Sequence, residues 1–291
     1  MKVLNYGSMN IDNVYAVPHM VAPGETLLAT GKQLFCGGKG LNQSIAMSKA
    51  GCEVYHAGVA GSDGQMLLDA LEQYGVSTRC IKRVPGSSGH TVIQVDASGQ
   101  NSIIVYSDEA ITFTDSEMDA ILRGFGPGDA LVEQNELSRS PEMMRKAAER
   151  GLTIIFNPSP ANEDIQKYPL DRVNWFVMNE IEGNMLTGET EPARILDAMA
   201  QKYPNASVLL TLGADGAYLR RDGETFFQPS FKVTAVDTTA AGDTFSGYFI
   251  SGMAAGEDMP TVLKRAAYAA SVAVSRKGAA DSIPARNEID F

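Results

Sequence analysis

The sequence predicts an α/β protein, with a doubly wound, mostly parallel sheet sandwiched by helices and a small β-sheet beside it. Short apolar runs typical of buried strands alternate along most of the chain with segments of helical periodicity, as expected where helices connect parallel strands. Three further strand-like segments, 14–17, 27–34 and 90–106, have no helix between them and indicate antiparallel strands of a separate sheet. No internal repeat or long linker divides the 291 residues. We therefore expect a single domain over 1–291, in which the small sheet is a lid inserted at about 13–35 and 90–107.

The first half of the chain alternates strand and helix. Its patterns predict strands at 3–6, 54–60 and 130–132, and helices at 39–50, 65–74 and 114–124. Gly51 follows the first of these helices, and glycine is common at that position. The stretch Thr114-Asp115-Ser116-Glu117 has the pattern of a capping box, which places the start of the third helix.

The second half continues the alternation. It predicts strands at 152–156, 175–178 and 208–212, and helices from Ser140, from Asn179, near 192–203, from about Ala241 and from Pro260. Pro141 suits the first turn of its helix, where its missing N–H costs nothing. Ligands in such folds bind outside the carboxyl ends of the parallel strands, so the residues that follow the strands are the first candidates for a site.

Composition excludes several classes of function. The 24 Lys and Arg residues against 35 Asp and Glu give a net charge of −11, which disfavours binding to nucleic acid or to anionic lipid. No apolar run approaches the roughly 18 residues of a membrane span, and polar residues begin too early for a secretory signal. Cys36, Cys52 and Cys80 are odd in number and have no C-x-x-C spacing, which argues against disulfides and zinc. We expect a soluble, cytoplasmic protein without nucleic-acid or membrane partners.

The segment Val236-Asp237-Thr238-Thr239-Ala240-Ala241-Gly242-Asp243-Thr244-Phe245 places small residues just before a helix. The backbone N–H groups of Ala241, Gly242 and Asp243 would be free at the helix N-terminus and would form an anion site. A carboxylate beside phosphate alone would be poorly placed, but Asp243 makes sense there if it faces a hydroxyl that attacks the phosphate. The alternative is that Asp243 only caps the helix.

The segment Cys36-Gly37-Gly38-Lys39-Gly40-Leu41-Asn42-Gln43 is the second candidate. Its three glycines permit a ligand to approach the backbone closely, and Lys39 and Asn42 supply donors for hydroxyl groups. It is not a Walker A loop, because Lys39 is followed by Gly40 in place of Ser or Thr. It also lacks the third glycine of a dinucleotide fingerprint, a position that Gln43 occupies. The alternative is a flexible glycine turn that leads into a helix.

The two segments, with the glycine segment first in the chain, together resemble the ribokinase-like (PfkB-type) family of carbohydrate kinases. In motif form they are closest to ribokinase. The resemblance covers essentially the whole chain and implies the ribokinase-like fold. It also implies ATP-dependent phosphorylation of a sugar hydroxyl, with D-ribose converted to D-ribose 5-phosphate as the leading reaction. Kinases of the same fold for a nucleoside, fructose or a 2-keto-3-deoxy sugar acid are the alternatives. An inactive sugar sensor would be expected to lose Asp243 or its glycines, which are present, and an NAD-dependent oxidoreductase would need the missing fingerprint.

The resemblance implies a role for each matching position. Asp243 matches the catalytic base, with the N–H groups of Ala241 to Asp243 as the anion hole. The implied sugar-binding residues are Asn10, Asp12, Gly38, Lys39, Asn42, Glu136 and Asp243. The implied nucleotide-binding residues are Asn179, Thr211, Gly213, Asp215, Gly216, Ala241 and Gly242. Glu133 and Asn135, beside Glu136, depart from the apolar neighbours usual in the family.

The resemblance also implies ATP, Mg²⁺ and K⁺ as cofactors, and a homodimer that forms through the lid. Glu182 would order the magnesium through water. The implied monovalent-cation residues are Asp237, Thr239, Ala273, Arg276, Gly278 and Ser282. Read from the residues alone, Asn179 could be a plain helix N-cap and Asp12 a solvated loop acid. Arg276 and Lys277 could be an ordinary cation pair at a helix end.

Overall fold

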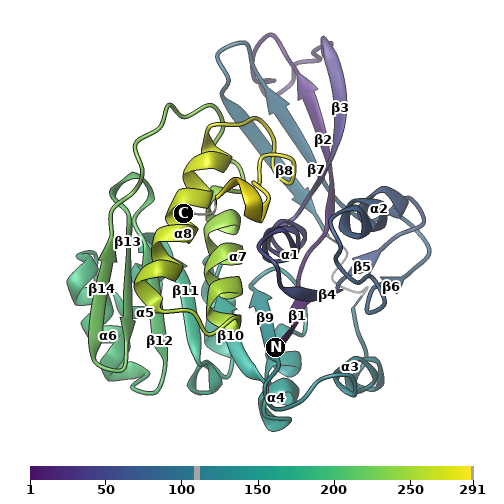
Figure 1. Ribbon diagram of the computed structural model, residues 1–291. Coiled ribbons are helices and arrows are strands. Elements are labelled where there is room, and N and C mark those ends of the chain that lie inside the picture. The colour runs from purple at the N-terminus through teal and green to yellow at the C-terminus, as the bar shows by residue number, and fades with distance from the viewer. Residues whose placement is uncertain (108–111, 290–291) are drawn as a thin grey trace.

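The main sheet is built from the short apolar runs of the sequence. In the computed structural model, which describes residues 1–107 and 112–289, eight strands have the order β14-β13-β12-β11-β10-β9-β1-β4 (Figure 1). In chain order they are β1 (Lys2–Tyr6), β4 (Glu53–Ala57), β9 (Ala130–Gln134), β10 (Thr153–Asn157), β11 (Trp175–Asn179), β12 (Ser207–Thr211), β13 (Ala217–Arg221) and β14 (Glu224–Gln228). The six strands from β4 to β12 pair in parallel, whereas the pairings of β12 with β13 and of β13 with β14 are antiparallel.

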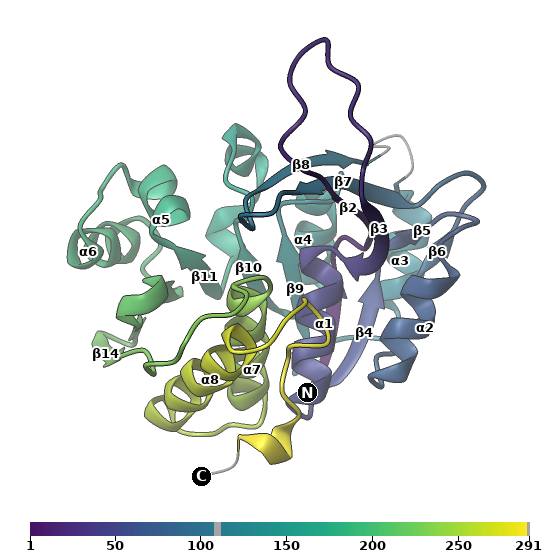
Figure 2. The ribbon, with the colours of Figure 1, turned by 90° about the horizontal axis from the view of Figure 1, so that it is seen from above.

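Helices cover both faces of this sheet. One group comprises α1 (Lys39–Lys49), α2 (Gln65–Gln73), α7 (Ala241–Ala254) and α8 (Met259–Val274). The other comprises α3 (Asp115–Leu122), α4 (Ser140–Glu149), α5 (Glu180–Thr187) and α6 (Pro192–Lys202). Because side chains alternate along a strand, Val3 of β1 joins the core under the first group and Leu4 the core under the second. Seen from above in Figure 2, the strands separate the two groups, which is the predicted sandwich.

A second sheet stands beside the first, in the order β3-β2-β7-β8. It consists of β2 (Asn10–Ala16), β3 (Gly31–Gly37), β7 (Gly89–Val95) and β8 (Asn101–Tyr106), and the connection from β2 to β3 extends well away from the body (Figure 2). The structure confirms the small sheet, but its strands are not all antiparallel as expected. The central strands β2 and β7 pair in parallel, because each is the first strand of a hairpin and the two hairpins enter the sheet in the same direction.

The structure differs from the local predictions at four places. The strand expected at 27–34 begins only at Gly31, and β2 begins at Asn10, so Asn10 and Asp12 lie in a strand and not in a loop. The strand expected at 54–60 is divided at Gly58 between β4 and the two-residue strand β5 (Val59–Ala60), which pairs with β6 (Lys82–Arg83). The hairpin of β13 and β14 was missed.

Helix ends follow the capping chemistry that the sequence shows. Thr114 and Glu117 form the predicted capping box at the start of α3. Short 3₁₀ helices occur at η1 (Glu163–Lys167), η2 (Leu170–Arg172), η3 (Gly213–Asp215) and η4 (Arg286–Glu288). Among the described residues, no helix is both long enough and apolar enough to cross a lipid bilayer.

Candidate active site

Asp243 stands at the N-terminal end of α7, where α7 lies against α1. Its Oδ1 accepts a hydrogen bond from Gln43 Nε2 at 3.0 Å, and its Oδ2 accepts one from Asn42 Nδ2 at 3.3 Å. The two helices can approach so closely because residue 247 is glycine: a Cβ there would lie 2.3 Å from the Cβ of Ala46. The two motif segments of the sequence, far apart in the chain, therefore meet at the Asp243 carboxylate.

Glycines bring the start of α1 onto the end of β1. A Cβ on Gly40 would lie 2.5 Å from backbone atoms of Gly7, so only glycine permits this contact. Gly38, which precedes α1, has a φ of 99°, a conformation that other residues rarely adopt. The glycine segment is therefore a specific backbone contact and not only a flexible turn.

The first turn of α7 offers free N–H groups, as predicted, with one difference. Ala240 precedes it in a left-handed conformation, and Thr244 N makes the first α-helical hydrogen bond, to Ala240 O at 2.8 Å. The N–H groups of Gly242 and Asp243 therefore have no acceptor within the helix. Ala241 N, which was also expected to be free, donates to Thr238 O at 3.3 Å.

A cavity of about 660 Å³ opens in front of this helix start. Five of the residues predicted to bind nucleotide line it, namely Thr211, Gly213, Gly216, Ala241 and Gly242. A Cβ built on Gly242 would meet no atom within 4 Å. The other walls are mainly apolar and include Phe231, Val233, Phe245 and Val274. An apolar pocket with N–H donors at one end suits a ligand with a flat ring and an anionic tail. Asp215 lies in η3 but does not line the cavity.

Charged side chains gather on the other side of Asp243. Burial alone would lower the pKa of Lys39, but the charges of Asp243, Glu136 and Glu182 outweigh it and raise that pKa. Burial raises the pKa of Glu136, against the effects of Lys39 and of the Ser8 hydroxyl, which donates a short hydrogen bond to Glu136 Oε2. The predicted residues Lys39 and Glu136 are thus partly buried and lie close enough to Asp243 for their charges to interact.

Asn10 and Asp12 project from β2 toward glycines of the neighbouring strands. A Cβ on Gly37 would lie 1.9 Å from Asp12 Oδ2, and a Cβ on Gly89 would lie 2.4 Å from Asn10 Oδ1. Asp12 Oδ1 accepts a hydrogen bond from Thr91 Oγ1 at 2.7 Å, and burial raises the pKa of Asp12. Asp12 is therefore a half-buried strand residue and not a solvated loop acid.

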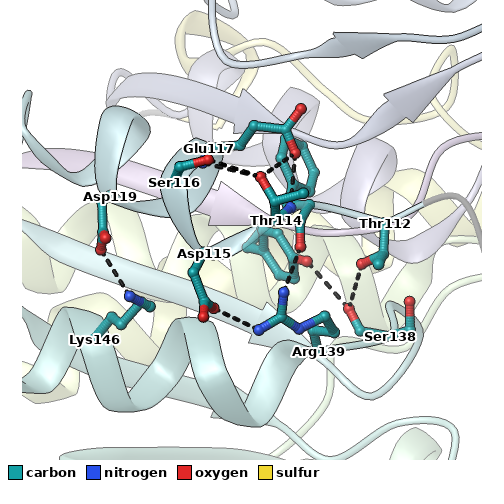
Figure 3. Close-up of polar contacts among 11 residues, drawn as sticks. Thr112, Thr114, Asp115, Ser116, Glu117, Asp119, Ser138, Arg139 and Lys146 are labelled. Carbon is teal, nitrogen blue, oxygen red and sulfur yellow. Dashed lines mark hydrogen bonds and ion pairs between the residues drawn. The ribbon is translucent and has the colours of Figure 1, made fainter.

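The loop that carries Glu136 is tied to the chain that returns from the small sheet. Arg139 donates to Phe113 O at 3.0 Å and pairs with Asp115, and Thr112 Oγ1 donates to Ser138 O at 3.2 Å (Figure 3). This cluster joins the start of α3 to the start of α4 and so supports the loop that carries Glu136.

Asn179 and Glu182 form the capping box of α5. Asn179 Oδ1 accepts from the backbone N of Ile181 and of Glu182, and Glu182 Oε2 accepts from Asn179 N at 2.7 Å. The N-cap interpretation of Asn179 is therefore correct as local structure. Within residues 1–107 and 112–289, no group of three or more His, Cys, Asp or Glu side chains is arranged to hold a metal ion.

The predicted cation segments come together behind the start of α7. Asp237 Oδ1 accepts from Thr239 N at 2.9 Å and Oδ2 from Gly278 N at 3.0 Å. Burial would raise the pKa of Asp237, but the hydrogen bonds from Thr239 and Gly278 outweigh it and lower that pKa. The remaining predicted residues, Ala273, Arg276 and Ser282, lie on the end of α8 and the loop after it. Arg276, just past the end of α8, pairs with Glu288 at 2.6 Å.

Sequence reasoning missed Gln43 as a site residue, together with Gln134 and Asn5 behind it. All three are buried, and Gln43 contacts Asp243 directly. The available signal was a polar side chain at a buried strand position, Asn5 in β1 and Gln134 in β9, where an apolar residue is the rule.

Comparison with known proteins places this geometry in a family. The family described as pfkB family carbohydrate kinase matches residues 1–286. The chain is 32% identical to the ribokinase of Haemophilus influenzae, with 97% of this chain and 95% of the relative covered. It superimposes on the ribokinase of Cryptococcus neoformans in complex with ADP with a TM-score of 0.87 and 32% identity, covering 99% of this chain and 98% of that one. For the Arabidopsis thaliana ribokinase complexed with ribose and ATP the TM-score is 0.86 at 30% identity, covering 99% and 97%.

These matches confirm the predicted ribokinase-like fold, with its mostly parallel sheet, its helices on both faces and its separate small sheet. They also confirm the resemblance stated from the two motif segments. The chain belongs to the pfkB family of carbohydrate kinases.

Proposed function

We propose that the protein transfers the γ-phosphoryl group of ATP to a hydroxyl of D-ribose, giving D-ribose 5-phosphate and ADP. The observation that carries this proposal is the place of Asp243. It lies in the first turn of α7, which opens on the 660 Å³ cavity, and its charge interacts with the partly buried Lys39. The Arabidopsis relative, which forms a complex with ribose and ATP, supports the choice of both substrates.

The chemistry follows from that place. The oxygen of the sugar hydroxyl bonds to the γ-phosphorus while Asp243 accepts the proton of that hydroxyl. The bond from the γ-phosphorus to the bridging oxygen of ADP breaks. The N–H groups of Gly242 and Asp243 face the charge that develops on the phosphoryl oxygens. Lys39, whose ammonium form the surrounding carboxylates favour, adds positive charge on the acceptor side.

The sugar would be held by Asn10, Asp12, Gly38, Lys39, Asn42 and Glu136. Asn42 Oδ1 is buried and has no hydrogen-bond partner among the described residues. An unpaired buried acceptor is costly, so a hydroxyl donor from the sugar is the group that this atom lacks. The small sheet, which carries Asn10 and Asp12, would cover the sugar and exclude water, with the whole of 1–291 acting as one domain.

The nucleotide would occupy the cavity, contacted by the residues that line it and by Asn179 and Asp215. Mg²⁺ would neutralise the phosphates and would be ordered through water near Glu182, whose charge already reaches Lys39. For K⁺, the donors that fit are the Asp237 carboxylate and backbone oxygens of the loop that it joins, because a large monovalent ion prefers such oxygens. The other residues of that site would be Thr239, Ala273, Arg276, Gly278 and Ser282.

The protein would work in the cytoplasm, where ATP is available, as a homodimer joined through the small sheet. That sheet exposes large apolar side chains, namely Leu34, Phe35, Ile103, Ile104 and Val105. Ile104 and Val105 are 63% and 62% exposed, which is unusual for neighbouring strand residues and favours a protein partner.

A panel of acceptors tests the function. ADP release is measured with ATP and D-ribose, 2-deoxy-D-ribose, D-fructose, a nucleoside or a 2-keto-3-deoxy sugar acid. We expect the kcat/KM for D-ribose to exceed that of the others by about tenfold or more, since a site built to bind a hydroxyl rejects analogues that lack it. A higher kcat/KM for another acceptor would support the kinase activity but show that D-ribose is not the preferred acceptor. The absence of acceptor-dependent ADP release would refute the proposal.

A further inference from the structure

Three buried side-chain amides form a line behind Asp243. Asn5 lies on β1, Gln134 on β9 and Gln43 on α1, and each is at most 1% exposed. Gln43 contacts the Asp243 carboxylate, Gln134 contacts Gln43, and Asn5 contacts Gln134. The line therefore runs from strands β1 and β9 of the main sheet to the first turn of α7.

From Gln134 to Asp243 the hydrogen bonds in this line run in one direction. Gln134 Nε2 donates to Gln43 Oε1 at 2.8 Å and to Asn5 Oδ1 at 3.0 Å. Gln43 Nε2 donates to Asp243 Oδ1 at 3.0 Å. If the Gln43 amide were turned over, its oxygen would face the carboxylate and its NH₂ group would face that of Gln134. The contact from Gln134 therefore allows only the orientation of Gln43 that donates to Asp243.

The two oxygens of Asp243 are consequently not equivalent. Oδ1 is held by Gln43, whereas the one described contact of Oδ2 is the longer one to Asn42 Nδ2, at 3.3 Å. Asn42 belongs to the segment proposed to bind the sugar, so Oδ2 is the oxygen directed to that side.

The line is maintained although it leaves a buried polar atom unpaired. Gln134 Oε1 has no hydrogen-bond partner within the described part of the chain. A Cβ on Gly7 would lie 2.4 Å from this atom, so Gly7 provides the space that it occupies. An apolar residue at position 134 would avoid the unpaired oxygen, which indicates that the amide is not there for stability alone.

We propose that Gln134 and Gln43 are positioning residues, which hold Asp243 through Oδ1 so that Oδ2 is aligned with the hydroxyl of the acceptor sugar. This inference rests on the proposed role of Asp243 as the base. Gln134 donates to Gln43 and not to Asp243, and it does not line the cavity in front of α7, so we expect its effect on the reaction to pass through Gln43.

Substitution by methionine tests the proposal, because methionine has nearly the volume of glutamine but cannot donate a hydrogen bond. In Gln43→Met and Gln134→Met we expect kcat to fall by at least about tenfold, since small errors in the alignment of reacting groups have large effects on rate. The KM values for sugar and ATP should change by less than about threefold, because neither amide is proposed to bind substrate.

The double variant makes the test sharper. If Gln134 acts only through Gln43, the variant with both substitutions should be no slower than Gln43→Met alone. Effects on kcat that multiply would show that Gln134 acts by another route and would overturn the proposal. If Gln134→Met does not fold, Gln134→Ser, which is smaller, replaces it in the same comparison.

Ser251→Ala is the matched control. Ser251 is buried on α7 and donates to Ala50 O at 2.9 Å, so it also joins α7 to the region of α1, but it does not reach Asp243. We expect this variant to have a lower Tm and an unchanged kcat. A Gln134→Met enzyme with a kcat within twofold of the wild type would overturn the positioning role. The proposed function fails separately, if wild-type enzyme releases no ADP or if Asp243→Asn is as active as the wild type.

Discussion

The two carboxylate oxygens of Asp243 accept hydrogen bonds from Asn42 and Gln43, and removing the charge of Asp243 tests its proposed role as the base. Asp243→Asn keeps the size of the side chain but cannot take a proton from the sugar. We expect kcat to fall by at least about a hundredfold, the usual contribution of a general base, while ATP and sugar still bind. Steady-state kinetics give kcat, and calorimetric titration gives the two affinities. Turnover near that of the wild type would refute the assignment.

Asp12 and Asn42 are expected to act on the sugar and not on the nucleotide. Asp12→Ala or Asn42→Ala would leave buried sugar hydroxyls unpaired, at about 1–3 kcal/mol each. The KM for the sugar should therefore rise by about tenfold or more, with little change in the KM for ATP. A selective loss of ATP affinity would mean that the sugar and nucleotide sites are exchanged.

Glu133 is a buried acid that the proposed reaction does not use. It is fully buried on β9 beside Tyr6 and Phe156, and neither of its oxygens has a hydrogen-bond partner among the described residues. Burial, with a smaller effect from the charge of Glu142, raises its pKa well above the ordinary value. The folded protein thus binds a proton here that the unfolded chain releases above a pH of about 4.5.

The stability of the fold should therefore fall as pH rises. The contribution of Glu133 is fully present below the unfolded pKa and is lost as pH rises toward the folded one. The glutamine of Glu133→Gln does not titrate. We therefore expect the free energy of unfolding of this variant, relative to that of the wild type, to increase by up to about 1.4 kcal/mol per pH unit between pH 5 and 7. Urea unfolding at several pH values measures this gain. A difference between the two proteins that does not change with pH would contradict it.

The start of α7 depends on a neighbouring loop. Asp237 binds backbone N–H groups of Thr239 and Gly278, so it joins the segment before α7 to the loop after α8. A cation bound beside Asp237 would hold the N–H donors of the first turn in place without touching ATP. The two segments thus form one unit that supports the anion site.

Potassium should therefore act on turnover. We expect kcat in KCl to be several-fold higher than in NaCl at equal ionic strength, because misplaced donors slow the reaction. Asp237→Ala should abolish this difference. Asp258→Ala is the control, since Asp258 accepts from Thr261 N at the opposite end of α8 and its loss should leave the response to potassium intact. Equal rates of the wild type in the two salts would rule out the cation site.

The small sheet would connect the proposed sugar site to the proposed dimer. Strand β8 is exposed along its whole length, and its side chains on both faces include Ile103 and Ile104. A second copy that covered this sheet would also hold β2, which carries Asn10 and Asp12, over the sugar. Assembly and sugar binding are therefore expected to be coupled.

Light scattering after size-exclusion chromatography tests the dimer. We expect about twice the 31.1 kDa of one chain for the wild type and a single chain for Ile104→Lys, because a buried charge disfavours an apolar interface. Met185→Lys is the control, since Met185 is an exposed apolar residue on α5, away from the small sheet. A wild-type protein of one chain, or a dimeric Ile104→Lys, would contradict the proposed interface.

Most of the main fold could be predicted from the sequence, because apolar periodicity and capping residues act between neighbours in the chain. The Thr114 capping box is an example that the structure confirms. The hairpin of β13 and β14 was missed although Asp222 and Gly223, both with positive φ, form a strong turn signal. Its strands carry charged and polar residues among apolar ones, so the apolar pattern did not mark them. The parallel pairing of β2 and β7 depends on the relative direction of two hairpins that are distant in the sequence, and no local sequence pattern indicates that direction.

The site divides in the same way. The sequence alone determined the family, the glycine segment and the helix start at Asp243, because these motifs are continuous in the chain. Only the tertiary structure decided which side chains hold Asp243. Gln43 reaches it from a helix far away in the sequence, and Gln134 orients Gln43 from a strand that shares no motif with either. The direction of their hydrogen bonds comes from packing β1, β9 and α1 against one another, and packing between distant segments is set by the whole fold and not by neighbours in the chain.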